Sequence, residues 1–108
     1  MGNVKNVSDS ELPSYVIATT EKPLFIDFWA EWCGPCKMVE PIINDLAIEF
    51  SGCTFIKINV DDCPTATSTY GIRSIPTFVI IKNNNIVYKH AGAQSKAALK
   101  EVLRSILH

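Results

Sequence analysis

Short apolar segments alternate along this chain with longer segments of helical periodicity, and no other feature limits the possible folds as much. Residues 24–29 are apolar and rich in aromatic side chains, which is typical of a strand buried on both faces, as in a parallel sheet. After Cys33 the apolar residues recur with a helical period as far as Gly52. A buried strand that leads directly into a helix is typical of α/β folds.

The rest of the chain continues the alternation. Ser8 and Glu11 have the spacing of a capping box, which predicts a first helix lined by residues 12–17, although Pro13 would remove a backbone donor from its second turn. Residues 54–60, 77–82 and 86–90 are predicted to be strands, and residues 64–71 a short helix. Apolar residues recur with a helical period from Leu99 to Ile106, which predicts a last helix. Residues 83–85 tolerate left-handed turn conformations and predict a hairpin. The chain should therefore form an α/β fold with a mixed sheet, and a ligand site is expected at the C-terminal ends of its parallel strands.

The length and charge of the chain exclude several classes of protein. With 108 residues, 47% of them apolar, we expect one domain over residues 1–108 whose core needs no metal or disulfide. Ten Lys plus Arg against eleven Asp plus Glu give a formal charge of -1, which leaves no basic field for nucleic acid or an anionic membrane. Apolar runs such as residues 78–81 are too short to cross a bilayer, and residues 1–12 lack the pattern of a secretory signal. We therefore expect a cytoplasmic protein that binds neither nucleic acid nor membranes.

Two cysteines lie where the predicted strand meets the predicted helix, in the sequence WCGPCK of residues 32–37. A C-x-x-C pair in this setting is typical of a redox-active dithiol. A thiolate at a helix start faces free backbone N–H groups and the positive end of the helix dipole, so we expect the pKa of Cys33 to be lowered and predict it to be the nucleophile. Cys36, one turn further in, is predicted to be the resolving thiol that attacks a mixed disulfide at Cys33.

The residues between and before the cysteines fit this chemistry. Gly34 permits close approach of the backbone and Pro35 fixes one dihedral angle, so the spacer should be stiff enough to open and close a small ring. Asp27 interrupts the apolar strand. Burial disfavours a charged carboxylate, so we expect the pKa of Asp27 to rise towards neutrality, where a general acid or base works best. Taken alone, Asp27 fits a purely structural buried carboxylate equally well.

The segment from Phe25 through WCGPCK resembles the thioredoxin family, and the resemblance extends over essentially the whole chain. Further matching segments, in the order and spacing of the family, are Lys57, residues 70–73, residues 75–77 and Gly92. The resemblance implies the thioredoxin fold, a central mixed five-stranded sheet flanked by four helices. It also implies a monomeric protein-disulfide reductase with no bound cofactor or metal, recharged by a thioredoxin reductase that draws electrons from NADPH through its own FAD.

The same resemblance assigns roles to individual residues. Asp27 is expected to help move the proton of Cys36, with Lys57 moderating the charge of Asp27. The peptide bond before Pro76 is expected to be cis, with the backbone of Ile75 paired to the substrate chain. The substrate-binding surface implied around the nucleophile consists of Trp32, Gly34, Pro35, Val60, Ile75, Pro76, Ala91 and Gly92.

Two positions depart from the family pattern, and two other functions remain open. Ser74 stands where a glycine is usual, which is expected to affect the preference for substrates or for the reductase, and residues 83–85 replace the usual Asn-Gly turn. An isomerase or oxidase on the same fold is one alternative, although the resemblance associates the Gly-Pro spacer with strongly reducing behaviour. A scaffold with an incidental dithiol is the other.

For Cys33 and Cys36 a third reading is half of a zinc site. Cys36 and Cys53 have knuckle-like spacing, but a second C-x-x-C is missing and His90 and His108 form no ligand pair, so redox chemistry is favoured. Cys53 is predicted to act as a small apolar residue. Cys63 precedes Pro64 at a helix start and is predicted to be an inert surface thiol, the alternative being an acidic thiol open to modification.

Overall fold

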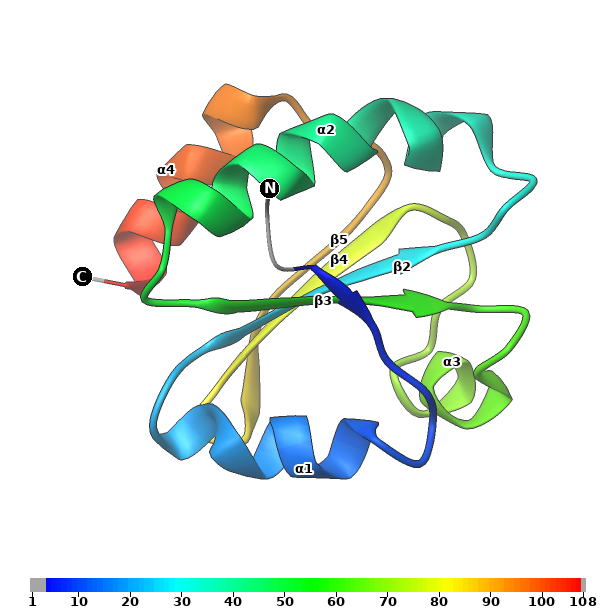
Figure 1. Ribbon diagram of the computed structural model, residues 1–108, viewed down its shortest axis with the longest axis horizontal. Coiled ribbons are helices and arrows are strands. Elements are labelled where there is room, and N and C mark those ends of the chain that lie inside the picture. The colour runs from blue at the N-terminus through cyan, green and yellow to red at the C-terminus, as the bar shows by residue number, and fades with distance from the viewer. Residues whose placement is uncertain (1–3, 108) are drawn as a thin grey trace.

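The computed structural model describes residues 4–107 and has a central sheet with helices on both faces (Figure 1). Its strands are β1 (Lys5–Asn6), β2 (Leu24–Trp29), β3 (Thr54–Asn59), β4 (Thr77–Lys82) and β5 (Asn85–Ala91). Its α-helices are α1 (Leu12–Ile17), α2 (Gly34–Glu49), α3 (Pro64–Thr69) and α4 (Lys96–Ile106), and a short 3-10 helix covers Ala18–Thr20. The mixed five-stranded sheet and four α-helices that the resemblance implies are confirmed within the described residues.

The sheet has the strand order β1-β3-β2-β4-β5. Strands β1 and β2 each run parallel to β3, whereas β4 is antiparallel to both β2 and β5. The register places Asp27 of β2 between Lys57 of β3 and Phe78 of β4. The carboxylate therefore lies on the central strand of the sheet.

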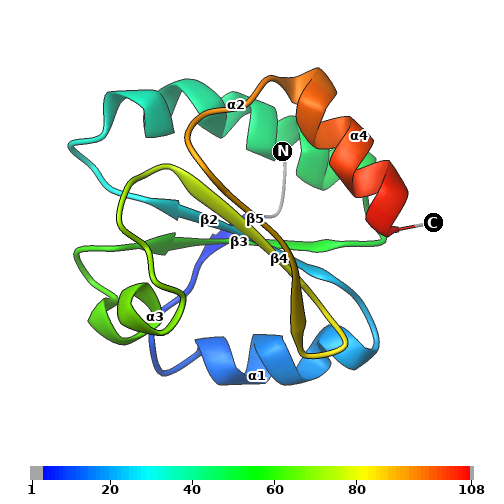
Figure 2. The same cartoon turned by 180° about the vertical axis from the view of Figure 1, so that it is seen from behind.

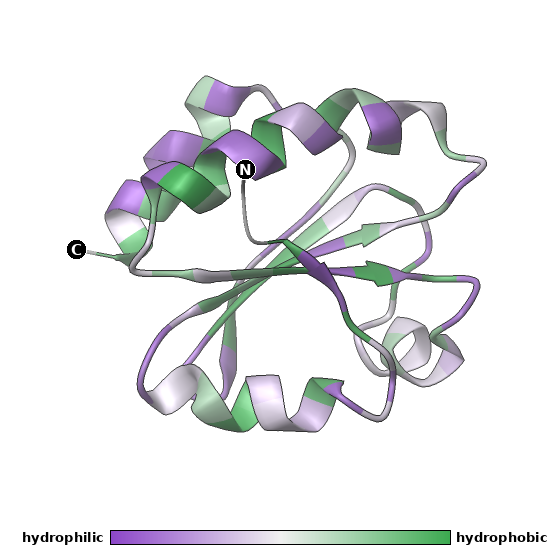
Figure 3. Ribbon diagram, viewed as in Figure 1, coloured by the Kyte–Doolittle hydropathy of each residue, from purple (hydrophilic) through white to green (hydrophobic). Residues whose placement is uncertain are grey.

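Two layers of helices enclose the sheet. Figures 1 and 2, seen from opposite sides, show α2 and α4 over one face and α1 and α3 over the other. The central strands are largely hydrophobic, whereas α2 and α4 also carry hydrophilic residues (Figure 3). Because successive side chains of a strand point to opposite faces, Ile26 joins the core beneath α1 and α3 while Phe25 joins the core beneath α2 and α4. Asp27 follows Phe25 by two residues, and Lys57 follows Phe55 of the same core by two, so both face α2.

Ser8 and Glu11 form the reciprocal hydrogen bonds of the predicted capping box, but they do so in the turn that precedes α1, whose N-cap residue is Glu11. The Ser8 N–H donates to Glu11 Oε1 at 3.0 Å, and the Glu11 N–H donates to Ser8 Oγ at 3.3 Å. The helix itself begins only at Leu12, so Pro13 stands in its first turn. No intrahelical donor is needed there, and the predicted loss of a bond in the second turn does not arise.

The other elements follow the predictions closely, with two exceptions. Asn83 and Asn84 have positive φ angles of 53° and 64°, as the predicted hairpin requires. Helix α2 ends at Glu49, three residues before Gly52. Strand β1 was not predicted, because it consists of two exposed residues and has no hydrophobic alternation to reveal it.

The loops that follow β2 and β3 and the loop that precedes β4 gather at one end of the molecule, on the right in Figure 1. This is the end where the parallel strands β2 and β3 finish. The cysteine pair follows β2 and opens α2, so it lies at this end, where the sequence predicted a site.

Candidate active site

Cys33 and Cys36 form a disulfide across the first turn of α2. Their Cα atoms are 5.3 Å apart. Cys33 has extended backbone angles (φ -90°, ψ 106°) and is the N-cap residue of the helix, where its Sγ accepts a hydrogen bond of 3.1 Å from the Cys36 N–H. Gly34 and Pro35 occupy the first helical positions between them and are exposed. A sulfur thus takes the place that a serine or aspartate oxygen usually has at a helix start, and a thiolate there is stabilised by the backbone donor and the helix dipole.

Both sulfur-bearing residues are buried in this disulfide state. Cys33 is 4% exposed and Cys36 is 3% exposed, and they form a small cluster with Ala30. Trp29, Val60 and Ile75 pack against this cluster. The dithiol is therefore shielded by apolar side chains, and only a partner that docks closely will reach it.

An apolar groove of about 360 Å³ lies beside the cysteine pair. Its lining residues are Trp32, Val60, Thr67, Ile72, Arg73, Ser74 and Ile75. Trp32 is 70% exposed, and its Nε1–H donates to Asp61 Oδ2 at 2.8 Å, which holds the indole over the groove. An exposed tryptophan fixed in this way offers contact area without a large loss of side-chain entropy on binding.

The loop before β4 forms one wall of this groove. The Ile75–Pro76 peptide bond is cis, as expected from the sequence. Thr77 Oγ1–H donates to the Ser74 carbonyl at 2.6 Å, and the Gly92 N–H donates to the Pro76 carbonyl at 2.8 Å. Gly92 has a φ of 108°, a conformation that favours glycine.

The residues predicted to bind substrate are only partly brought together. Trp32, Val60 and Ile75 line the groove itself. The other five lie around it without lining it: Gly34 and Pro35 begin α2, Pro76 and Gly92 are joined by the hydrogen bond above, and Ala91 pairs with Thr77 at the end of the hairpin.

Asp27 is buried beneath the dithiol and lacks a compensating partner. Its side chain is 4% exposed, and its Oδ1 has no hydrogen-bond partner among the described residues. Loss of hydration raises the pKa of Asp27 from its ordinary value of 3.8 to about 7; the Lys57 ammonium opposes the rise and the Glu40 carboxylate adds to it. The predicted shift towards neutrality is confirmed, and this carboxyl can give or take a proton near neutral pH.

A cavity of about 300 Å³ connects Asp27 with Cys36. Its lining residues are Asn6, Asp27, Trp29, Glu31, Cys36, Lys37, Glu40 and Lys57. Lys57 lies opposite Asp27 in the register of β2 and β3. Its Nζ donates to Glu40 Oε2 at 3.2 Å and lies 4.9 Å from the centre of the Trp29 ring. The cavity is polar and large enough for water, so a proton can pass between Cys36 and Asp27 through water molecules.

Sequence reasoning missed three residues of the site. Glu40 lies four residues after Cys36, a spacing that puts both residues on one face of α2. This spacing is the sequence signal by which Glu40 could have been assigned to the site. Asp61 holds Trp32, and the Asn6 Oδ1 accepts a hydrogen bond of 3.0 Å from Trp29 Nε1–H. Nothing in the sequence pointed to these two pairings, because each joins segments more than 20 residues apart.

The prediction of a surface thiol at Cys63 is wrong. Cys63 is 2% exposed, and its Sγ–H donates to the Val7 carbonyl at 3.5 Å, because the segment after β1 covers it. Burial and the neighbouring Asp9 carboxylate raise the pKa of the Cys63 thiol, so the alternative of an acidic thiol also fails. Cys53 is buried in the apolar core, as predicted, and burial raises the pKa of its thiol to about 12.

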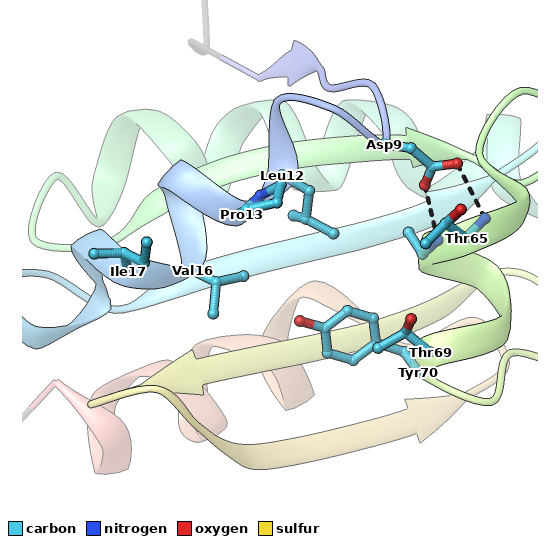
Figure 4. Close-up of a pocket in the computed structure, with 9 residues that line it drawn as sticks. Asp9, Leu12, Pro13, Val16, Ile17, Thr65, Thr69 and Tyr70 are labelled. Atoms are coloured by element: carbon cyan, nitrogen blue, oxygen red, sulfur yellow. Dashed lines mark hydrogen bonds between the residues drawn. The ribbon is translucent and has the colours of Figure 1, made fainter.

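A second apolar groove lies between α1 and α3 (Figure 4), and neither Cys33 nor Cys36 lines it. It has a volume of about 340 Å³ and is lined mainly by Leu12, Val16, Ile17 and Tyr70. Asp9 at its edge accepts hydrogen bonds from the backbone N–H groups of Thr65 (3.0 Å) and Ala66 (2.8 Å) and so caps α3 (Figure 4). This groove shares no residue with the groove at Trp32 or with the cavity at Asp27.

Over residues 4–107, no three His, Cys, Asp or Glu side chains gather in a way that would hold a metal ion. His108, one of the two histidines weighed in the sequence, lies outside the described residues. In the same part of the chain, no helix combines the length and the apolar character needed to span a membrane.

Comparison with known proteins agrees with this geometry. The family model described as "Thioredoxin" matches residues 3–105. The thioredoxin of Haemophilus influenzae is 42% identical over 100 residues, which are 92% of each chain, and the chloroplastic M-type thioredoxin of Pisum sativum is 44% identical over 94% of this chain and 59% of its own. The solved structure of a mutant thioredoxin from Halobacterium salinarum superposes with a TM-score of 0.85 at 32% identity, covering 97% of this chain and 90% of that one.

The family match, the fold and the cysteine pair at the start of α2 lead to one conclusion. The chain belongs to the thioredoxin family and is a protein-disulfide reductase whose redox-active pair is Cys33 and Cys36.

Proposed function

We propose that this chain reduces disulfides of partner proteins with Cys33 as the attacking and Cys36 as the resolving sulfur, and that an NADPH-dependent, flavin-containing thioredoxin reductase recharges it. The observation that carries the proposal is the position of Cys33 as the N-cap residue of α2, with its Sγ accepting the Cys36 N–H. An anionic sulfur is stabilised at that point, whereas Cys36 lies inside the first turn, behind it.

The reaction has two exchange steps. The Cys33 thiolate attacks a substrate disulfide, so a Cys33–substrate bond forms and one substrate thiolate leaves, taking a proton from water. The Cys36 thiolate then attacks Cys33 Sγ, the Cys33–Cys36 bond forms, and the second substrate thiolate is released and protonated. Two electrons pass from the dithiol to the substrate. The Cα atoms of the closed pair are 5.3 Å apart, within the range of ordinary disulfides.

Asp27 is proposed to accept the proton that Cys36 loses before it attacks. Its carboxyl has a pKa of about 7 and shares a polar cavity with Cys36, so its charged and neutral forms are both populated at neutral pH. Lys57 lies opposite Asp27 and opposes the rise of its pKa. We assign Lys57 the role of moderating the charge of Asp27 and no direct contact with sulfur.

Substrate is proposed to dock at the groove beside Trp32. The groove is apolar and adjoins the buried pair, and its wall includes the exposed Ser74 and the half-buried Ile75, so an extended segment around a substrate cysteine can lie there with few demands on its sequence. Ser74 lines this groove, which supports the expectation that its hydroxyl affects the choice of substrate or reductase.

The deciding experiment couples NADPH oxidation to the reduction of insulin disulfides, with a purified thioredoxin reductase and this chain. Wild type should sustain NADPH oxidation, Cys33→Ser should abolish it, and Cys36→Ser should accumulate mixed disulfides with protein substrates. The proposal fails if the wild-type chain is not reduced by any thioredoxin reductase supplied, or if Cys33→Ser keeps its activity. Faster refolding of a scrambled disulfide protein without net reduction would favour the isomerase alternative.

The cytoplasmic location and the monomeric state are also part of the proposal. Cys53 and Cys63 are free thiols, as is usual in a compartment that keeps thiols reduced, although related proteins are chloroplastic. Cell fractionation tests the location, and light scattering of the purified chain tests the monomer.

A further inference from the structure

Glu40 lies at the mouth of the cavity that joins Asp27 to Cys36, yet the reaction described above gives it no part. It follows Cys36 by one turn of α2 and lines the same cavity, with its side chain 53% exposed. Its Oε2 is 3.2 Å from Lys57 Nζ. A carboxylate on the helix thus reaches across to the lysine of the sheet.

Lys57 stands between two carboxylates that it could neutralise. It is opposite Asp27 in the sheet register, and its side chain faces α2 as that of Asp27 does. Its ammonium nevertheless bonds to Glu40 and lies over the Trp29 ring, while Asp27 Oδ1 has no hydrogen-bond partner among the described residues. The ammonium is therefore bonded to the carboxylate at the mouth of the cavity and not to Asp27 Oδ1.

We propose that Glu40 is a positioning residue of the reductase: it holds the Lys57 ammonium at the mouth of the cavity and thereby limits how strongly that ammonium stabilises the charged form of Asp27. The inference rests on the proposed role of Asp27 in moving the proton of Cys36. Without Glu40, the ammonium is free to turn towards Asp27, and the carboxyl then stays ionised to lower pH and holds a proton less well at neutral pH.

The charges around Asp27 agree with this arrangement. The charged and titratable groups that share its cavity are Glu31 from the loop after β2, Cys36, Lys37 and Glu40 from α2, and Lys57 from β3. On its other side, Asp27 pairs with the apolar Phe78 of β4. The Lys57 and Glu40 charges act in opposite directions on the pKa of Asp27, the first lowering it and the second raising it.

The test is a titration of the Asp27 carboxyl carbon by NMR in the oxidised protein, for wild type and for Glu40→Ala. We expect the midpoint to fall by about half a pH unit or more in the variant, since two unit charges about 4 Å apart interact by more than that even in bulk water, and more strongly near a protein surface. Glu40 is half exposed on a helix and alanine favours helices, so the variant will fold; its thermal unfolding provides the check. An unchanged or raised midpoint would overturn the proposal.

A matched control lies on the same helix. Glu49 of α2 makes a similar surface ion pair with Lys100, 3.0 Å apart, and does not line the cavity. Glu49→Ala removes the same kind of charge from the same helix and should leave the Asp27 midpoint in place. An equal shift in Glu49→Ala would show a general effect of net charge and would overturn the assignment to Glu40.

A double-variant cycle distinguishes an effect of Glu40 through the position of Lys57 from a direct electrostatic effect of the Glu40 charge on Asp27. In a Lys57→Met background, Glu40→Ala should shift the Asp27 midpoint by less than half of its shift in wild type, because the ammonium that Glu40 positions is gone. An equal shift in both backgrounds would mean that Glu40 acts on Asp27 directly, and the positioning role would be wrong.

The pH dependence of insulin reduction distinguishes this inference from the proposed role of Asp27. If both hold, the pH profile of Glu40→Ala moves in the same direction as the NMR midpoint, and Asp27→Asn loses the corresponding inflection. If the NMR midpoint moves but the pH profile does not, Glu40 positions Lys57 as inferred, and it is the proton-transfer role of Asp27 that fails.

Discussion

Asp27 occupies a position where an apolar residue would stabilise the sheet better. Its neighbours in the register are the aliphatic stem of Lys57 and the ring of Phe78, and one of its oxygens has no hydrogen-bond partner in the described part of the chain. Burial of a carboxylate without full compensation costs free energy whenever the group is charged. The cost makes sense if the carboxyl exchanges protons with Cys36.

The first prediction concerns the stability of Asp27→Asn. Because folding raises the pKa of Asp27 from 3.8 to about 7, the folded state binds the proton more tightly than the unfolded state. The free energy of unfolding should therefore fall as the pH rises from about 4 to 7, and by roughly 2–3 kcal/mol between pH 5 and pH 8 from this group alone. The asparagine variant should lack that part of the pH dependence. Urea denaturation at both pH values measures it, and an equal pH dependence in the two proteins would contradict the prediction.

The second prediction concerns the reactivity of Cys33 in the reduced protein. The backbone N–H of Cys36 and the dipole of α2 stabilise an anionic sulfur at Cys33, so its alkylation rate should have a midpoint below the pH of about 8.5 typical of a free thiol. Mass spectrometry identifies the alkylated residue, with Cys53 and Cys63 as internal controls that should stay unmodified because they are buried. A midpoint at 8.5 or above would refute the dipole effect.

At the scale of single elements, helix ends determine much of the local structure. Helix α3 is short, and its own N-cap residue, Cys63, makes no side-chain capping bond. The cap comes instead from Asp9, far away in sequence, which accepts the N–H groups of Thr65 and Ala66. The segment before α1 and the start of α3 are therefore stabilised together.

The third prediction tests that cap. Asp9→Ala should lower the free energy of unfolding by about 1–2 kcal/mol, because two backbone donors lose their partner, and Asp9→Asn should lose less since one acceptor remains. Asp45→Ala, which removes an exposed ion pair with Lys96, is the control and should change stability by less than about 1 kcal/mol. Equal losses in Asp9→Ala and Asp45→Ala would show that the cap contributes nothing specific. Disulfide reduction should be unchanged in all three variants.

The elements that could be predicted from the sequence are those with a strong hydrophobic period. The run at β2 was found to the residue and the long period of α2 to within three residues at its end, and the positive φ angles at Asn83 and Asn84 follow from the residue type. Strand β1 has no such period, and its two residues pair with β3 only because the sheet already exists.

The site was predictable where chemistry is local in sequence. The pair at the start of α2 and the buried Asp27 follow from a motif and a pattern. Exposure of Cys63 was predicted wrongly, because a helix start next to a proline is usually at the surface and the covering segment comes from residue 7. The link between Glu40 and Lys57 depends on how α2 lies across the sheet, which no local pattern encodes.

At the scale of the whole molecule, the dithiol separates two spaces with different chemistry. The groove at Trp32 is apolar and open to a partner, whereas the cavity at Asp27 is lined by charged and polar groups. No residue lines both. The cluster of Ala30, Cys33 and Cys36 packs against Val60 and Ile75, which line the groove, and Cys36 also lines the cavity. A substrate can therefore be bound on one side while a proton moves on the other.

The fourth prediction follows from this separation. Trp32→Ala removes a large exposed surface from the groove and should raise KM for insulin several-fold, as loss of an aromatic contact residue commonly does, without moving the pH profile. Asp27→Asn should change the pH profile and kcat with little effect on KM, and the double variant should show the two effects added in free energy, because the sites share no residue. Ile48→Ala, an exposed apolar residue near the other end of α2, should change neither constant. A Trp32→Ala variant whose pH profile shifts like that of Asp27→Asn would mean that substrate docking and proton transfer are coupled through the disulfide, and the division into two spaces would not describe the mechanism.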